Sequence, residues 1–154
     1  MTDQKDSEVG KVVGDIEMSP ALANQLKQLS AFLYDEGTPM KGCELSEEDA
    51  IALAKTHFPN KPYRLVANWR WINLDISESE SKAVRDEGCE PCLIYASKIL
   101  VDSQSQYSRG NWVRSTLHVS FTHGCLFETP NTIYVLMGEG SVKTEKPGVV
   151  MSIF

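Results

Sequence analysis

The chain has 154 residues and a mass of 17.2 kDa. Its formal net charge is −6, and 42% of its residues are hydrophobic. This length and composition predict one globular domain with its own core and exclude a disordered chain. No apolar run approaches the roughly 18 residues of a membrane span, and the polar start, MTDQKDSEVG, does not resemble a secretory signal. We therefore expect a cytoplasmic protein, not bound to membranes, with four reduced cysteines.

The acidic excess lies entirely in the N-terminal part of the sequence. Residues 1–60 contain five Lys or Arg and eleven Asp or Glu, whereas residues 61–154 contain ten of each. This distribution argues against nucleic acid as a partner. Residues 1–18 show no hydrophobic periodicity, so we expect a mobile acidic arm there and a single α+β domain over residues 19–154.

Two helices are predicted in the first part of the chain. Residues 19–37 form one, with Ser19 as the N-cap and Gly37 as the stop signal. Its leucines share one stripe, at positions 22, 26, 29 and 33. Residues 46–58 form the second, with Ser46 as the N-cap and three acidic residues in the first turn. We expect both helices to bury one face.

After residue 60 the sequence is typical of β-strands. Residues 63–76 (YRLVANWRWINLDI) alternate, which places Trp69 and Trp71 on the core side, and the apolar phase shifts near Trp71. Residues 92–103 predict a central strand, residues 112–121 a second alternating strand, and the tail an edge strand. Because the turns are short, we expect two N-terminal helices packed on one face of a mostly antiparallel sheet of four to six strands.

The alternation also predicts a polar face opposite the core. If the strands at 63–76 and 112–121 are close in the sheet, an exposed tryptophan lies among arginines, which is typical of a protein-binding surface. The candidate binding residues are Arg64, Asn68, Arg70, Trp112, Arg114 and His118. A second subunit could cover this face, so a homo-oligomer is an alternative.

The segment EGCEPCLIY, residues 87–95, contains the only close cysteine pair. A redox-active dithiol needs a thiol at the start of a helix, whereas this pair precedes a strand. A zinc site needs four ligands, and the candidates are Cys89, Cys92, His123 and Cys125, although the His-x-Cys spacing is unusual. The simpler interpretation is that Cys92 and Cys125 are small buried residues. We expect no cofactor, with zinc as the alternative.

Catalytic motifs are weak in this sequence. His118 and His123 lie five residues apart near Ser120 and Thr122, but the chain has no Gly-x-Ser-x-Gly elbow and no phosphate-binding loop. A hydrolase or nucleic-acid enzyme built around His118 and His123 is therefore the third hypothesis, and it requires both side chains to line one pocket. We do not expect an enzyme.

The stretches PYRLVANWRWINLD and GNWVRSTLHVSF, followed by GCLFETPNTIYVLMG, resemble a family of small uncharacterised proteins from proteobacteria and their phages. The resemblance covers roughly residues 58–140, and it implies an accessory gene but no activity, cofactor or catalytic residue. The leading hypothesis is a non-enzymatic protein-binding module, an inhibitor or modulator encoded on a phage or mobile element. A zinc-stabilised small protein is the alternative.

Overall fold

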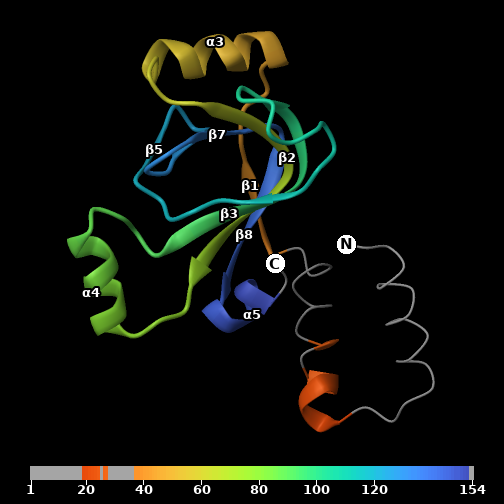
Figure 1. The fold of residues 1–154 in the computed structure, drawn as a ribbon, viewed down its shortest axis with the longest axis vertical. Coiled ribbons are helices and arrows are strands. Elements are labelled where there is room, and N and C mark those ends of the chain that lie inside the picture. Colours follow the sequence, from red (N-terminus) through yellow and green to blue (C-terminus); the bar gives the residue numbers. More distant parts are fainter. Residues whose placement is uncertain (1–18, 25, 28–36, 153–154) are drawn as a thin grey trace. The chain divides into compact units, whose positions relative to one another are not determined.

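The computed structural model describes residues 19–24, 26–27 and 37–152 (Figure 1). The chain divides into two compact units, one of residues 36–147 and one of residues 1–35 with 148–154. In the smaller unit, residues 20–24 and 26–27 are helical, and the hydroxyl of Ser19 accepts a hydrogen bond from the Leu22 amide at 3.1 Å. The Ser19 cap is thus confirmed. The predicted arm and the rest of the first helix, residues 28–36, lie outside the described residues.

The larger unit contains most of the regular structure. Its elements are β1 (Thr38–Lys41), α3 (Glu47–His57), β2 (Tyr63–Leu74), α4 (Glu78–Asp86), β3 (Cys92–Asp102), β4 (Val113–Arg114), β5 (Ser120–Thr122), β6 (Leu126–Glu128), β7 (Ile133–Leu136) and β8 (Glu139–Glu145). Helix α5 (Pro147–Ser152) follows, and all of it after Pro147 belongs to the smaller unit. In this described part, eight strands join in one sheet along the order β1-β8-β2-β7-β6-β5, with β3 paired to β2 and β4.

The predicted fold class is wrong, because the protein is mostly sheet and the sheet is mixed. Strand β2 pairs antiparallel with β3 along one edge, and its other edge pairs in parallel with β7 and then with β8. The sheet curls into a half-barrel, and the helices are short rather than forming a two-helix layer (Figure 1). Short turns favour antiparallel neighbours, but they do not determine which strands pair across a long stretch of sequence. Strands β7 and β8 instead lie against β2, far earlier in the chain.

Residues 113–122 connect the two sides of the curled sheet. They begin beside β3, where Val113 pairs with Ala96, and end beside β6, where Thr122 pairs with Leu126. Between these ends the ladder is interrupted, and the hydroxyl of Ser115 accepts a hydrogen bond from the Ile94 amide at 2.8 Å. The single strand predicted over residues 112–121 is therefore two short strands, β4 and β5, joined by an irregular stretch.

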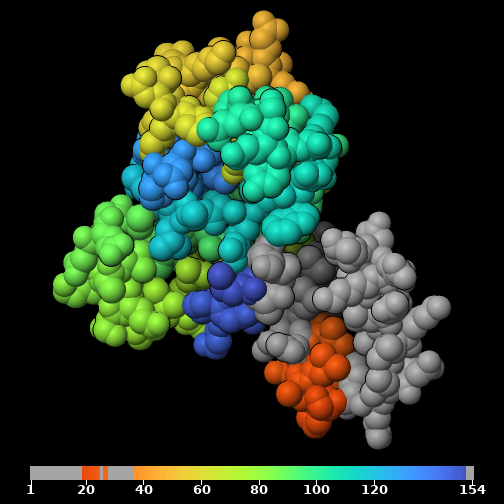
Figure 2. All heavy atoms as spheres, viewed as in Figure 1, coloured from red at the N-terminus to blue at the C-terminus, as the bar shows by residue number. Residues whose placement is uncertain are grey.

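Both helices of the larger unit have the caps that their sequences encode. Helix α3 begins after Ser46, whose side chain accepts from the Asp49 amide, and lies against β2 and β7. This confirms the second predicted helix. Helix α4 has a capping box formed by Ser77 and Glu80, and it has no buried residue. It protrudes from the unit in Figure 2.

Strand β2 is irregular in the middle, earlier than the shift predicted near Trp71. Its register with β3 shifts between Leu65 and Val66, and Asn68 has a positive φ of 52°. Arg64, Leu65 and Val66 are all buried, although strict alternation predicts that Arg64 and Val66 face solvent. Trp69 remains in the core, 1% exposed.

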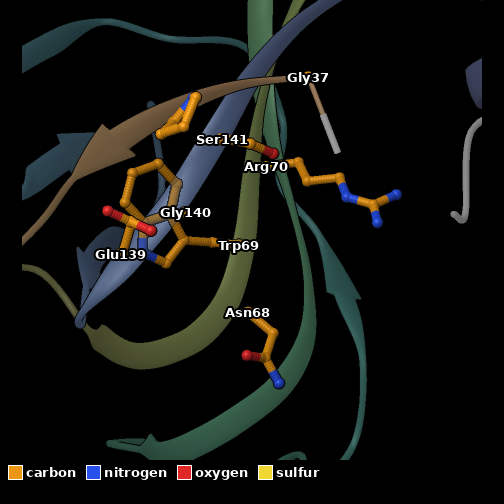
Figure 3. A pocket seen from close by; sticks show the side chains of 8 residues that line it. Gly37, Asn68, Trp69, Arg70, Glu139, Gly140 and Ser141 are labelled. Carbon is orange, nitrogen blue, oxygen red and sulfur yellow. The ribbon is translucent and has the colours of Figure 1, made fainter. Parts of the chain in front are cut away.

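The side chain of Trp69 fills the space where β7 bends into β8. The indole nitrogen donates to the carbonyl of Met137 at 3.2 Å, in the link between the two strands. The ring lies against Gly140, where a Cβ atom would come within 2.3 Å of it (Figure 3). Only glycine leaves room for the indole at this position. The parallel pairing of β2 with β7 and β8 therefore depends on the large ring of Trp69 packing against Gly140, which has no side chain.

Replacing Gly140 with alanine should therefore destabilise the protein. The added methyl group meets a buried ring with no space to move, and overpacking of this kind costs about 1–3 kcal/mol. Urea unfolding followed by tryptophan fluorescence measures the change. The control is Gly148→Ala, because no atom of the described residues lies within 4 Å of a Cβ atom at that glycine. Equal stability of the two variants would contradict the role of Gly140.

Candidate functional site

Three of the predicted binding residues surround one tyrosine on the sheet. Arg70 of β2 pairs directly with Tyr95 of β3, and Tyr95 pairs directly with Arg114 of β4. Directly opposed residues in antiparallel strands project from the same face. The ring of Trp112 stacks on Tyr95 with centroids 6.3 Å apart. We call Arg70, Tyr95, Trp112 and Arg114 the Trp112 patch.

The Trp112 patch combines a large exposed ring with charged neighbours. Trp112 is 50% exposed, whereas Tyr95 is half-buried. Burial raises the pKa of Tyr95, and the positive charge of Arg70 opposes that rise. The predicted strands are not adjacent, because β3 lies between them. The sequence did not identify Tyr95 as a candidate, because it occurs in a mostly apolar segment in which no polar alternation marks it.

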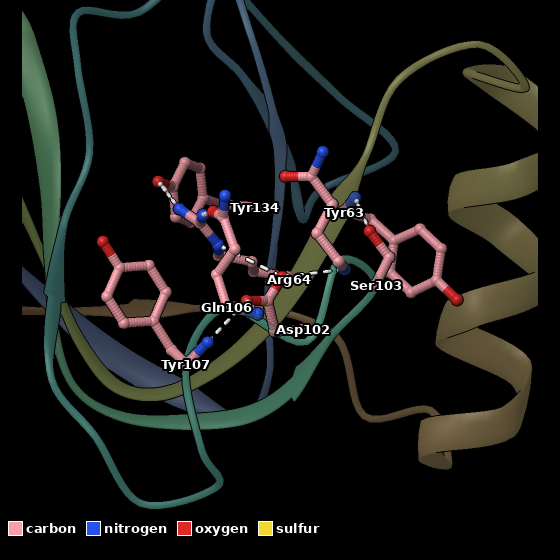
Figure 4. A network of polar contacts seen from close by, with 8 residues as sticks. Tyr63, Arg64, Asp102, Ser103, Gln106, Tyr107 and Tyr134 are labelled. Carbon is pink, nitrogen blue, oxygen red and sulfur yellow. Dashed lines mark hydrogen bonds and ion pairs between the residues drawn. The ribbon is translucent and has the colours of Figure 1, made fainter.

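Arg64 lies apart from the Trp112 patch, in a buried polar network (Figure 4). It is only 9% exposed, and it donates to the hydroxyl of Tyr134 at 2.9 Å and to the side-chain oxygen of Gln106 at 3.0 Å. The guanidinium also lies 4.8 Å from the centre of the Tyr107 ring, a cation–π distance. Arg64 therefore holds the β3–β4 loop against the start of β2 rather than standing on a solvent-exposed face.

Asp102, the last residue of β3, completes this network. Its carboxylate accepts backbone hydrogen bonds from Gln104, Gln106 and Tyr107 and lies 3.5 Å from Nε of Arg64. Although burial opposes it, the backbone donors and Arg64 hold the pKa of Asp102 below its ordinary value. One carboxylate thus shapes the loop of residues 103–112, which leads to Trp112.

Asn68 lines a shallow groove of about 240 Å³ between β1, β2 and β8 (Figure 3). Arg70 and Glu139 line the same groove, so a positive and a negative group border it. Asn68 is exposed, and its positive φ fits asparagine, one of the few residue types that adopt this conformation readily. Arg70 thus borders both the groove and the Trp112 patch, whereas Asn68 belongs to the groove.

His118 contacts aromatic residues instead of the arginines. Its ring centre lies 5.5 Å from that of Trp71 and 5.0 Å from that of Phe127. Burial lowers its pKa, against the opposing charges of Glu90 and Glu128. Among the described residues, its buried Nδ1 atom has no hydrogen-bond partner. The ring is therefore favoured in its neutral form and packs as part of the aromatic cluster.

The two histidines of the enzyme hypothesis have different surroundings. His118 lines a pocket of about 300 Å³ with Trp71, Glu90 and Cys92. The ring of His123 instead lies 3.9 Å from that of His57, at the end of α3. Burial raises the pKa of Cys92 to about 12, so its thiol is protonated near neutral pH and is a poor nucleophile.

The cysteines do not gather as the zinc hypothesis requires. Cys125 forms a disulfide with Cys43, and their Cα atoms are 5.5 Å apart across 82 residues of sequence. The expectation of four reduced thiols is therefore wrong for this pair, which sequence spacing could not reveal. Cys89 and Cys92 are free. Within the described residues, no group of three or more His, Cys, Asp or Glu side chains is arranged to hold a metal ion.

Counting thiols tests this assignment of the cysteines. In denaturant without reductant, Ellman's reagent should detect two thiols per chain, from Cys89 and Cys92. In the native protein Cys89 should react first, because Cys92 is 6% exposed and has a raised pKa. The Cys89→Ser variant should lose only the fast phase. Four thiols in the denatured protein would contradict the disulfide.

Comparisons with known proteins give a family but no activity. No helix in the described part of the chain is long and apolar enough to cross a membrane. No curated protein matches the sequence, and no solved structure matches it either. One family profile matches residues 41–152, which cover the strands and helices of the candidate site. The chain belongs to the family described as Domain of unknown function (DUF6957).

Proposed function

We propose that this protein is a protein-binding module and that the Trp112 patch is its contact surface. The observation that carries the proposal is the row of Arg70, Tyr95 and Arg114 across three neighbouring strands, with Trp112 stacked on the tyrosine. Tryptophan, tyrosine and arginine are the residue types that contribute most to binding energy in protein interfaces. Here the strand register brings the tyrosine and two arginines together, and stacking on Tyr95 adds Trp112.

The loop that positions Trp112 also favours binding at the patch. An exposed aromatic ring loses little conformational entropy on binding when the protein already orders it. Trp112 follows a loop whose first half is anchored by the Asp102 carboxylate, and its second half is tied to β3 through backbone bonds of Gly110 and Asn111 with Ile99. The ring is thus presented on an ordered segment, which favours a specific contact.

The mode of action that we propose is modulation of the bound protein rather than catalysis. The resemblance to proteins of proteobacteria and their phages supports a host protein as the partner. Gene neighbourhood tests this part of the proposal, since location beside phage, defence or toxin genes is expected. Consistent location within operons of housekeeping metabolism would contradict it.

Truncation of Trp112 should remove partner binding. In quantitative affinity capture from the cell of origin, the Trp112→Ala variant should recover the partner at least about tenfold less well, because a hot-spot residue contributes about 2 kcal/mol or more. Leu45→Ala is the matched control, since Leu45 is also apolar and 43% exposed but lies outside the Trp112 patch. Equal recovery of every protein by the wild type and both variants would contradict the proposal.

A further inference from the structure

A second surface feature lies beside the Arg64 network. A pocket of about 350 Å³ opens between the start of β2, the β3–β4 loop and the segment before β7. Its described lining is polar, and none of those residues is Asp or Glu. The residues that matter here are Arg64, Arg114, Tyr134, Gln106, Thr116 and Asn131. A polar pocket of this size accommodates a small charged group rather than an apolar side chain.

Arg64 has more donors than the protein uses. Its guanidinium carries five N–H groups, and three of them reach Asp102, Tyr134 and Gln106. Within the described residues, the other two have no acceptor. Because the hydroxyl oxygen of Tyr134 accepts from Arg64, its own proton is directed elsewhere, and it too has no described acceptor. Arg64 and Tyr134 can therefore donate to a bound group.

The charge of the pocket favours an anion. Asp102 partly neutralises Arg64, but its side chain is 1% exposed and its oxygens bind the loop backbone. It therefore lies behind the guanidinium rather than in the pocket. Arg114 also lines the pocket and adds a second positive charge. Two guanidinium groups beside hydroxyl and amide donors match the acceptors of a carboxylate or phosphate.

We propose that this pocket binds an oxyanion, a carboxylate or phosphate group, through Arg64, Tyr134 and Arg114. Arg64 and Tyr134 donate directly to the anion, and the positive charge of Arg114 attracts it. Gln106 fixes the orientation of the guanidinium through its side-chain oxygen. The site does not depend on the proposed function, because a free small anion can occupy it without any protein partner.

The test is an NMR titration of the full chain at constant ionic strength. Inorganic phosphate and succinate serve as the two probes, with potassium chloride as the reference salt. We expect saturable shifts of the Arg64 Nε–H and Thr116 amide signals. Saturation by phosphate alone assigns a phosphate site, by succinate alone a carboxylate site, and by both a general oxyanion site. Absence of saturable shifts with both probes overturns the proposal.

Variants separate this pocket from the neighbouring patch. Tyr134→Phe removes one donor and keeps the buried ring, while Arg114→Gln removes a charge from a half-buried side chain. Each should weaken binding of the effective probe at least tenfold. Arg70→Gln is the matched control, because Arg70 lies in the Trp112 patch and does not line this pocket. Undiminished binding by both pocket variants, or equal weakening in the control, overturns the assignment.

Discussion

The carboxylate of Asp102 is the group on which both candidate surfaces depend. It ends the strand β3 and accepts hydrogen bonds from three successive parts of the following loop, at residues 104, 106 and 107. Arg64 lies beside it and donates onward to Gln106 and Tyr134. A buried carboxylate with several donors resists protonation and holds its neighbours in one arrangement. These hydrogen bonds hold the first half of the loop of residues 103–112, and backbone bonds of Gly110 and Asn111 with Ile99 hold the second half.

The loop of residues 103–112 contributes to both candidate surfaces, the polar pocket and the Trp112 patch. On one side of the loop, Arg64 and Tyr134 line a polar pocket. At the end of the loop, the ring of Trp112 stacks on Tyr95 and completes the Trp112 patch. Arg114 borders both, as it lines the pocket and pairs with Tyr95. An anion in the pocket would therefore change the electrostatic environment of the patch.

The local features of the fold can be predicted from the sequence, whereas its long-range contacts cannot. The caps of Ser19 and Ser46 depend on residues within one turn, so they could be predicted. The parallel pairing of β2 with β7 and β8 depends on Trp69 meeting Gly140, and the disulfide depends on contact between Cys43 and Cys125. These contacts join residues about 70 to 80 positions apart, and no periodicity within a strand encodes them.

The same distinction explains the candidate site. Arg70, Trp112 and Arg114 could be placed on one face from alternation, and the structure brings them together around Tyr95. The burial of Arg64 could not be predicted, because Tyr134 of β7 and residues Gln106 and Tyr107 of the β3–β4 loop contact its guanidinium. A strand pattern predicts the face of a residue, but not whether a distant loop covers that face.

Hydrogen exchange at the loop amides tests the role of Asp102 most directly. The amides of Gln104, Gln106 and Tyr107 should be protected in the wild type, although all three residues are exposed. In Asp102→Asn their protection should fall about tenfold or more, since a hydrogen bond to a charged acceptor contributes about 1.5–3 kcal/mol. The amide of Ile94 in β3 should keep its protection. Unprotected loop amides in the wild type, or equal protection in both proteins, would contradict the account.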